Sequence, residues 1–380
     1  MGKRIKIIAD DKIPFLKGVL EQTAEIEYLP AAEIKNENVK DADALLIRTR
    51  TRCDSLLLDN TSIKFIATAT IGFDHIDVDY CKTNNIKWIN AAGCNSSSVM
   101  QYFASAILTL SQRKNIHLSG KTIGIIGVGN VGKKIEKLSR LLGMNVLLND
   151  PPREREEGSD KFTNLDDLIK ESDIITFHVP LNLGGIDKTY HLADENFFGK
   201  LKNPKILINT SRGEVIKTEV LMERLRSGMI LSCVLDVWEN EPEINLELLD
   251  LVNIATPHIA GYSVEGKANG TAACVNAFNE YFDLGLEQNW YPQNLHAPEI
   301  ANEVVIECGG KSIYEIFHEL ITFTYTILKD DQRLRIKPNE FEKQRENYPV
   351  RREFPFYRVK LIGADNLQKS KVEELGFKVI

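Results

Sequence analysis

Residues 122–150 read TIGIIGVGNVGKKIEKLSRLLGMNVLLND, and the rest of the chain is best understood outward from this stretch. It opens with the apolar run 123–126, which has the length of a buried strand. Three glycines follow in the spacing G-x-G-x-x-G, and then an amphipathic segment carries apolar residues at helical intervals. A second apolar run, 146–148, leads to Asp150. The order strand, glycine turn, helix, strand and acid predicts a dinucleotide-binding unit.

Each glycine has a physical role in such a unit. Gly127 permits the tight turn, Gly129 lets the backbone approach a pyrophosphate, and Gly132 lets the helix pack close to the strand. The N-terminus of the helix offers free N–H groups and a positive dipole end to the phosphates. We therefore count Asn130 and Val131, which lie between the glycines, among the predicted cofactor contacts.

Asp150 distinguishes between the two nicotinamide cofactors. Its carboxylate can accept hydrogen bonds from the adenosine ribose hydroxyls, and its charge repels a 2′-phosphate. A lone G-x-G-x-x-G also occurs in unrelated glycine turns, but here the strand, the helix and the acid about 20 residues on accompany it. The stretch thus predicts NAD as the cofactor, in preference to NADP.

The composition is that of an ordinary globular protein. The 380 residues, 43% of them hydrophobic, suggest two or three domains, and the net charge of −7 gives no reason to expect nucleic acid or membrane partners. No apolar run approaches the roughly 20 residues of a membrane span, and no signal peptide is recognisable. The six cysteines lack metal or C-x-x-C spacing. We expect no metal, reduced thiols and a cytoplasmic protein.

Apolar runs alternate with helical patterns along most of the chain, which favours parallel strands joined by crossovers. Residues 1 to about 92 show such runs without a phosphate fingerprint, with helical patterns between them such as Ile13–Leu20. Six runs in the middle of the chain would complete a Rossmann sheet: 123–126, 146–148, 173–178, 205–209, 231–235 and 252–255. Residues 359–380 read as strand, helix and strand.

Three polar residues follow predicted strands of the Rossmann sheet. Arg212, Glu241 and His258 come after the strands that end near residues 209, 235 and 255, so strand geometry places them along one crevice. A histidine carries protons near neutral pH, a glutamate can orient its imidazole and favour the charged form, and an arginine can hold a carboxylate bidentately. Together they suit oxidation of a 2-hydroxy acid by NAD. Taken singly, each also fits a structural role.

At these residues the chain resembles the D-isomer-specific 2-hydroxyacid dehydrogenases. The matching motifs cover roughly residues 40–275 and are GVGNVG (127–132), HVPL (178–181), INTSRGEVI (208–216), LDVWENEP (235–242) and PHIAG (257–261). In that family an arginine, a glutamate and a histidine form the catalytic set. The resemblance therefore implies catalytic roles for Arg212, Glu241 and His258.

The resemblance also implies contacts with the cofactor and the substrate. For the cofactor the implied contacts are Val179, Thr210, Ser211, Asp236 and Gly261, with Asp236 near the nicotinamide carboxamide. For the substrate they are Thr49, Thr70, Ile71, Gly72 and Tyr262. Residues 70–72 are expected to offer backbone N–H groups to the substrate carboxylate.

Finer motifs resemble one branch of the family, which acts on a phosphorylated 2-hydroxy acid and carries an extra C-terminal dimerisation domain. They include IRTRT (47–51), TATIGFDHID (68–77), AGCNSSSV (92–99), NDPPR (149–153), HIAGYSVEGKANGT (258–271), LKDDQRLR (328–335), FEKQRENYPVRREF (341–354) and LGFKVI (375–380). This implies an α/β protein that forms a homodimer. Its three domains would be a flavodoxin-like substrate domain (1–96 plus 262–285), a Rossmann-type doubly wound NAD domain (97–261) and a small α+β dimerisation domain (286–380).

A substrate phosphate requires cations. Arg48, Arg50 and Arg52 alternate past a predicted strand and would then project on one face. Arg351 and Arg352 would either reach a partner's cleft or lie on the solvated surface. Of these five we expect Arg48 to bind the substrate.

Two other functions remain compatible with the motifs. One is another dehydrogenase of the same family, for example one that acts on 3-phosphoglycerate. The other is an NAD-sensing regulatory protein on the same fold, because such a protein can keep all three polar residues.

Overall fold

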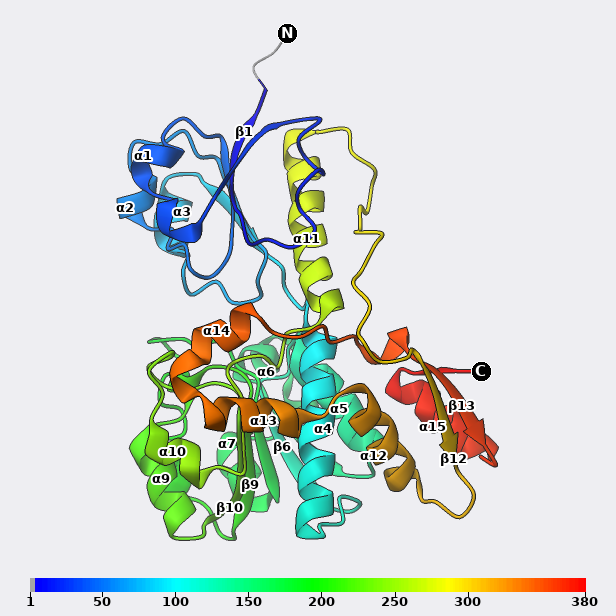
Figure 1. Ribbon diagram of the computed structural model, residues 1–380. Helices are drawn as coiled ribbons and strands as arrows, with labels where there is room; N and C mark the ends of the chain where they lie inside the picture. Colours follow the sequence, from blue (N-terminus) through cyan, green and yellow to red (C-terminus); the bar gives the residue numbers. More distant parts are fainter. Residues whose placement is uncertain (1–3) are drawn as a thin grey trace. The chain divides into compact units, whose positions relative to one another are not determined.

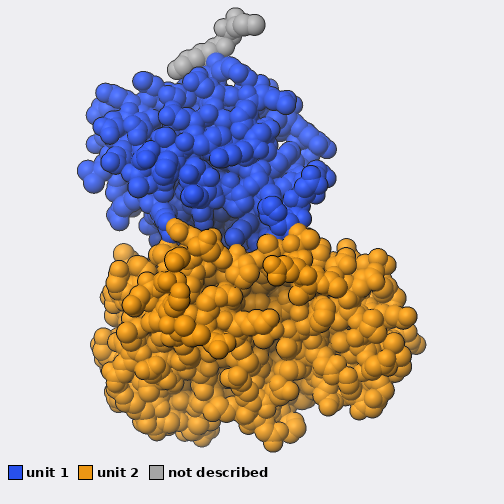
Figure 2. Space-filling model, in the orientation of Figure 1, with its two compact units in different colours: residues 1–95, 263–296 blue, residues 96–262, 297–380 orange. Residues whose placement is uncertain are grey.

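The computed structural model describes residues 4–380, so the first three residues of the predicted substrate domain lie outside the described part (Figure 1). The chain forms two compact units. Unit 1 comprises the residues up to Asn95 together with Ser263–His296, and unit 2 comprises Ser96–Tyr262 and Ala297–Ile380 (Figure 2). The C-terminal region from residue 297 onward is therefore part of the same compact unit as the glycine turn.

Within the described residues of unit 1, five parallel strands form one sheet in the order β2-β1-β3-β4-β5. The strands are β1 Lys6–Asp10, β2 Glu25–Leu29, β3 Ala44–Ile47, β4 Phe65–Thr68 and β5 Lys87–Asn90. The accompanying helices are α1 Asn36–Val39, α2 Ser55–Leu58, α3 Val78–Thr83 and α11 Val264–Phe282. This strand order is the flavodoxin-like one that we expected. Every residue of β3 and β4 is buried, as in strands covered on both faces.

Two features of unit 1 differ from the sequence prediction. Strand β2 was not predicted, because its sequence EIEYL is half polar and only partly buried at the sheet edge. The helical prediction for Ile13–Leu20 is wrong, since the segment forms turns. Phe15 and Gly18 have φ values of +62° and +86°, which a right-handed helix excludes. The apolar spacing instead serves the core of the unit.

Within residues 96–262, six parallel strands form a second sheet in the order β11-β10-β9-β8-β6-β7. The strands are β6 Thr122–Ile126, β7 Asn145–Asn149, β8 Ile174–Phe177, β9 Lys205–Asn209, β10 Ile230–Leu235 and β11 Ile254–Ala255. All six predicted strands are confirmed. The backbone N–H of Thr163 donates to the carbonyl of Leu148 at 2.7 Å, so an irregular segment runs along the outer edge of β7.

One helix, α4 Ser96–Lys114, precedes the six-stranded sheet, and the other helices of residues 96–262 follow its strands. They are α5 Asn130–Leu141, α6 Pro151–Glu157, α7 Leu165–Glu171, α8 Glu195–Gly199, α9 Thr218–Arg226 and α10 Leu246–Leu251. The two prolines after Asp150 begin α6. Proline suits the first turn of a helix, and the Asp150 side chain caps that turn by accepting from the backbone N–H of Arg153.

The C-terminal region contributes helices and a small sheet to unit 2. Its helices are α12 Ile313–Thr324, α13 Ile327–Ile336, α14 Phe341–Glu346 and α15 Asn366–Leu375. Within residues 297–380 the parallel strands β12 Glu303–Glu307, β13 Arg358–Ile362 and β14 Lys378–Val379 pair in the order β12-β13-β14. Along β12 and β13 exposed and buried residues alternate, so one face of this sheet is solvated.

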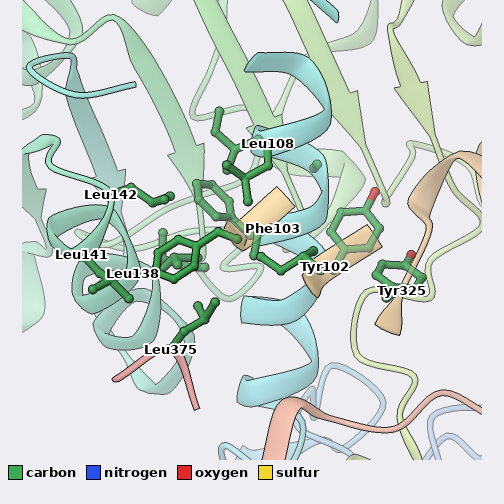
Figure 3. Packing of buried hydrophobic residues seen from close by; sticks show 14 of the residues in the cluster. Tyr102, Phe103, Leu108, Leu138, Leu141, Leu142, Tyr325 and Leu375 are labelled. Atoms are coloured by element: carbon green, nitrogen blue, oxygen red, sulfur yellow. The ribbon is translucent and has the colours of Figure 1, made fainter. Parts of the chain in front are cut away.

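The C-terminal region shares a hydrophobic core with the Rossmann sheet through α4, whose middle is buried nearly all round. Tyr102 of α4 lies 6.4 Å from Tyr325, between ring centroids, and Leu375 of α15 belongs to the same cluster as Leu138 and Leu141 of α5 (Figure 3). The chain after residue 297 is therefore built into the unit that carries the glycine turn.

None of the helices formed by residues 4–380 is long and apolar enough to cross a membrane. No group of three or more His, Cys, Asp or Glu side chains among these residues is arranged to hold a metal ion.

Candidate active site

The glycine turn after β6 leaves no room for side chains at two of its three glycines. Gly127 has a φ of +89°, and a Cβ there would lie 2.5 Å from the carbonyl oxygen of His178. A Cβ on Gly132 would lie 2.1 Å from the carbonyl oxygen of Gly127. At Gly129 a Cβ would meet nothing within 4 Å. Gly127 and Gly132 thus fix the turn, and Gly129 faces open space.

The open space lies at the N-terminus of α5. Gly129 is the N-cap of that helix and provides no side-chain cap, so Asn130 and Val131 begin the helix with uncapped N–H groups. Asp150 lies beside this turn, because its Oδ2 accepts from the backbone N–H of Val128 at 2.8 Å. A diphosphate fits the uncapped helix end, and ribose hydroxyls fit the carboxylate. These residues suit NAD, although their contacts with it stay predictions.

The next part of the site follows strands β8 and β9. The imidazole of His178 is bonded to Thr176 (Nε2 to Oγ1, 3.0 Å) and lies 3.4 Å from the hydroxyl of Thr210. Burial lowers the pKa of His178 to about 3, so this histidine is neutral at physiological pH. Val179 lies against Gly127, and Asn209 accepts from both the N–H and the hydroxyl of Ser211. The predicted contacts Val179, Thr210 and Ser211 therefore cluster at the carboxyl ends of neighbouring strands.

His258 and Glu241 form a direct pair. His258 Nδ1 lies 2.7 Å from Glu241 Oε2, and Glu241 Oε1 accepts from the backbone N–H of Trp238 at 2.9 Å. Burial acts to raise the pKa of Glu241, but the imidazole and these hydrogen bonds outweigh it, and the pKa lies below its usual value. A charged carboxylate on Nδ1 leaves Nε2 as the ring nitrogen that can exchange a proton with a substrate.

Asp236 fixes the backbone on which His258 sits. Its Oδ1 accepts from the hydroxyl of Thr256 at 2.6 Å and from the N–H of Ile259 at 2.8 Å, while Oδ2 accepts from the N–H of Ala260 at 2.8 Å. Burial, the largest influence, raises the pKa of Asp236. His258 itself has a φ of +54°, a left-handed conformation that a non-glycine residue keeps only when its surroundings enforce it.

Arg212 follows β9 and lies beside the loop that carries Glu241. Its carbonyl accepts from the side-chain amide of Asn209 at 2.8 Å, which closes the turn after the strand. A Cβ on the next residue, Gly213, would lie 1.9 Å from the backbone carbon of Trp238, so the two loops touch backbone to backbone. The three predicted catalytic residues thus come from adjacent strands β9, β10 and β11 at one edge of the sheet. Their catalytic roles stay predictions.

Unit 1 contains the predicted substrate loop. The carbonyl groups of residues 70–72 are occupied, since they accept from the N–H of Ala91, the side-chain amide of Asn90 and the hydroxyl of Thr70. Among residues 4–380 no hydrogen-bond partner exists for the backbone N–H of Thr70, Ile71 or Gly72. This arrangement suits the prediction that the three N–H groups bind a carboxylate.

The arginines expected to bind phosphate are arranged differently from the prediction. Strand β3 ends at Ile47, and Arg48–Thr51 form a turn closed by the Thr51 N–H on the Arg48 carbonyl at 3.2 Å. The prediction that Arg48, Arg50 and Arg52 alternate along an extended segment is therefore wrong. Arg48 donates to the carbonyl of Lys12 at 3.4 Å, and Thr49 is exposed on the same turn.

Arg351 and Arg352 are not on the solvated surface, because only 5% and 8% of them are exposed. No pattern in the sequence indicates this burial. Arg345 on α14 was also missed: its guanidinium lies 5.9 Å from the ring centre of Tyr262, the predicted substrate contact that follows Gly261. Trp238, whose backbone N–H donates to Glu241, lies within the motif LDVWENEP, so the sequence could have indicated it.

Comparison with known proteins agrees with this geometry. Residues 101–260 match the family described as D-isomer specific 2-hydroxyacid dehydrogenase, NAD binding domain, and residues 295–376 match a domain of unknown function. The chain is 49% identical to erythronate-4-phosphate dehydrogenase from Bacteroides fragilis, over 93% of this chain and 99% of that protein. It is 40% identical to the enzyme of the same name from Proteus mirabilis, over 92% and 93%.

A solved structure resembles this chain in fold. It is the NAD+-bound 3-phosphoglycerate dehydrogenase from Entamoeba histolytica, with 24% identity, a TM-score of 0.63, and coverage of 75% of this chain and 97% of that one. At this identity the likeness concerns the fold alone. The matches to proteins of known sequence extend through the C-terminal region, whereas the solved structure leaves a quarter of this chain unmatched.

Proposed function

The chain belongs to the D-isomer-specific 2-hydroxyacid dehydrogenases, and from that premise we propose that it oxidises 4-phospho-D-erythronate at C2 with NAD. The product is (R)-3-hydroxy-2-oxo-4-phosphooxybutanoate, and the reaction serves the synthesis of pyridoxal 5′-phosphate (vitamin B6). The observation that carries the proposal is the 2.7 Å pair of His258 and Glu241 at the same sheet edge as the glycine turn. Two relatives that the chain matches over nine-tenths of its length carry the name of this activity.

NAD, held at the glycine turn, would supply the acceptor for the hydride that leaves C2 of the substrate. The proton of the C2 hydroxyl passes to Nε2 of His258, and the carboxylate of Glu241 on Nδ1 stabilises the imidazolium that results. Arg212 holds the substrate carboxylate and polarises the adjacent oxygen. For the backbone N–H groups of Thr70, Ile71 and Gly72 we propose the carboxylate-binding role that the family resemblance implies.

The glycine turn and the residues after β8 to β11 would hold NAD. Gly129, Asn130 and Val131 would face the pyrophosphate, and Asp150 would accept hydrogen bonds from the ribose hydroxyls. The other proposed cofactor contacts are Val179, Thr210, Ser211, Asp236 and Gly261, with Asp236 near the nicotinamide carboxamide. The substrate contacts outside the catalytic set are Arg48, Thr49 and Tyr262.

The test is the formation of NADH, followed by its absorbance, with a panel of 2-hydroxy acids. 4-Phospho-D-erythronate should be oxidised with the highest kcat/KM, and D-erythronate without the phosphate should react at least about tenfold more slowly, since each 1.36 kcal/mol of lost binding is tenfold in rate. Preference for 3-phosphoglycerate would point to the other dehydrogenase activity. Absence of turnover with every acid would favour an NAD-sensing protein and contradict the proposal.

We propose further that the chain forms a homodimer through residues 286–380 and acts in the cytoplasm. In support of the first, Val305, Phe323 and Ile362 of the C-terminal region expose 58%, 42% and 39% of their surface. In support of the second, all six cysteines, which lie in the described part of the chain, are free. Sedimentation equilibrium of the wild type and of Val305→Asp tests the dimer, which should weaken in the variant.

A further inference from the structure

We propose that Arg351 is a positioning residue of the active site: its guanidinium, supplied by the C-terminal region, fixes the loop that carries His258. The effect that this role should have on turnover rests on the proposed function. It gives the C-terminal region a task inside its own chain, in addition to any task at a subunit interface.

Arg351 holds the carbonyl groups that follow the catalytic histidine. Its Nη2 donates to the carbonyl of Ile259 at 3.2 Å and to that of Ala260 at 2.5 Å. The N–H groups of the same two residues donate to the carboxylate of Asp236, each at 2.8 Å. The loop is thus held by a buried anion on one side and a buried cation on the other.

The peptide group between Ile259 and Ala260 shows this most clearly. Its N–H, on Ala260, donates to Asp236, and its carbonyl, on Ile259, accepts from Arg351. The peptide dipole therefore lies between the two charges with its positive end toward the anion and its negative end toward the cation. Charge-assisted hydrogen bonds of this kind are roughly twice as strong as neutral ones, and the low dielectric of a buried site strengthens them further.

Asp236 and Arg351 hold the loop next to a residue whose backbone conformation is unfavourable. His258 adopts a left-handed φ of +54°, and its N–H donates to the carbonyl of Asp236 at 2.7 Å. A left-handed histidine relaxes toward ordinary backbone angles unless its neighbours prevent it. Holding residues 259 and 260 at both their N–H and C=O groups prevents that relaxation, and it keeps the imidazole on the carboxylate of Glu241.

The C-terminal region packs two tyrosine rings against this guanidinium. Arg351 is 5% exposed and lies over the rings of Tyr325 and Tyr348, at 4.5 and 5.7 Å from their centroids. The hydroxyls of both tyrosines donate to Oδ2 of Asp330, at 2.9 and 2.7 Å. Tyr325 packs in turn against Tyr102 of α4 (Figure 3). Residues of the C-terminal region thus pack against the arginine that contacts the catalytic loop.

Stability alone does not account for such an arginine. A buried cation without a directly bonded carboxylate costs desolvation, and an apolar residue of similar size often serves packing equally well. Specific donation to two adjacent carbonyl groups, by contrast, suits the rigid, donor-rich guanidinium. The geometry therefore points to a positional role.

The experiment compares Arg351→Met and Arg351→Lys with a matched control in the same region, Arg335→Met. Arg335 also donates to two backbone carbonyls, those of Leu249 and Val252, at 2.6 and 2.8 Å, but these end α10 and do not belong to the catalytic loop. Two quantities are measured on the full-length protein: kcat with 4-phospho-D-erythronate, and hydrogen exchange of the backbone amides of residues 258–261.

We expect Arg351→Met to lower kcat by roughly 10- to 100-fold, since a misplacement of about 1 Å in a catalytic group has effects of this size. The amides of residues 259 and 260 should exchange at least about tenfold faster. Arg351→Lys keeps the charge without the guanidinium and should fall between wild type and methionine in both measurements, and it replaces the methionine variant if that variant does not fold. Arg335→Met should keep kcat within about twofold.

Unchanged exchange at residues 259 and 260 in both Arg351 variants would overturn the proposal, as would an equal loss of kcat in Arg335→Met. The exchange measurement needs no substrate. A wild-type protein that oxidises none of the acids would therefore refute the proposed function separately, while the exchange rates would still decide whether Arg351 holds the loop.

Discussion

Two parallel sheets in this molecule share a local strand order and differ in the segment after their first strand. In unit 1, β1 lies between β2 and β3, and in unit 2, β6 lies between β7 and β8. Each first strand therefore ends at a point where the strand order reverses, which is where open α/β sheets bind ligands. Only one of the two strands leads into a glycine turn and a helix.

The loop after β1 is unsuited to a dinucleotide. The carboxylate of Asp10 accepts from the N–H of Lys12 at 2.8 Å, so an acid occupies the turn where a phosphate would have to lie. Turns, and no helix, lead on to β2. After β6 the uncapped end of α5 is available to an anion. Strand order thus sets the place of a site, while the loop chemistry decides whether a nucleotide can bind there.

Among changes that test this difference between the two loops, the largest effect should come from substituting Gly132, which fixes the turn after β6. In Gly132→Ala the new Cβ would lie 2.1 Å from the carbonyl oxygen of Gly127, so the turn or the helix must move. We expect NAD affinity to fall more than about tenfold and the free energy of unfolding to drop by about 1–3 kcal/mol, as for overpacking elsewhere. Calorimetric titration with NAD and denaturant unfolding measure the two quantities.

The control for this change lies in the other unit. Gly18 has a φ of +86°, but a Cβ on it would meet nothing within 4 Å. Gly18→Ala should cost about 1 kcal/mol of stability through its left-handed backbone and leave NAD affinity unaltered. If both alanine variants bound NAD equally well, the glycine turn would not be the cofactor site.

A smaller effect should come from the acid at the end of β7. Asp150→Asn removes the charge that repels a 2′-phosphate and retains an oxygen that can accept a hydrogen bond. We expect the ratio of kcat/KM for NAD over NADP to fall about tenfold, which corresponds to 1.36 kcal/mol. The exposed acid Asp160 provides the matched control, since Asp160→Asn changes the net charge equally. An unaltered ratio in Asp150→Asn would assign cofactor choice to other residues.

The smallest effect should be a pH dependence of the protein's folding stability, which arises from His178 in the loop after β8. The pKa of His178 is about 3 in the folded protein, against 6.5 as its ordinary value, so below pH 6.5 the unfolded state takes up a proton that the folded state does not. Stability is therefore lost as the pH falls. From pH 6.5 to 5.5 the loss should be at most about 1 kcal/mol, given 1.36 kcal/mol per proton and pH unit.

Denaturant unfolding at the two pH values measures this loss in the wild type and in His178→Asn. The variant lacks the titrating ring, so its stability should vary less with pH over this interval. Identical pH dependence in the two proteins would mean that His178 is not held neutral by the fold.

The sequence was sufficient to predict the parts of the molecule that rest on burial. The strands of the six-stranded sheet are continuous apolar runs, because both faces of a parallel sheet are covered. The edge strand β2 is half exposed and mixes polar with apolar residues, so it lacks that signal. Residues 13–20 carry apolar residues at helical intervals, but Pro14 and the left-handed Phe15 and Gly18 make them turns.

The candidate site was predictable only where a residue follows a strand. Arg212, Glu241 and His258 satisfy that rule, and the pairing of the last two follows from adjacent strands. Arg351 comes from a segment about 90 residues beyond the loop it contacts, and its partners are peptide carbonyls. Since every residue has a carbonyl group, no pattern of side chains could have indicated that contact.

The proposed reaction requires that the His258–Glu241 pair transfers the substrate proton and that NAD binds at a separate site. The most direct test is His258→Gln, with NAD affinity measured by titration and a single turnover of 4-phospho-D-erythronate followed as NADH absorbance, and with the exposed His117→Gln as control. We predict that NAD affinity stays within about twofold of wild type while the rate of turnover falls by roughly 10²- to 10⁴-fold, the usual contribution of a general base. A near-normal rate in His258→Gln would show that His258 is not the general base.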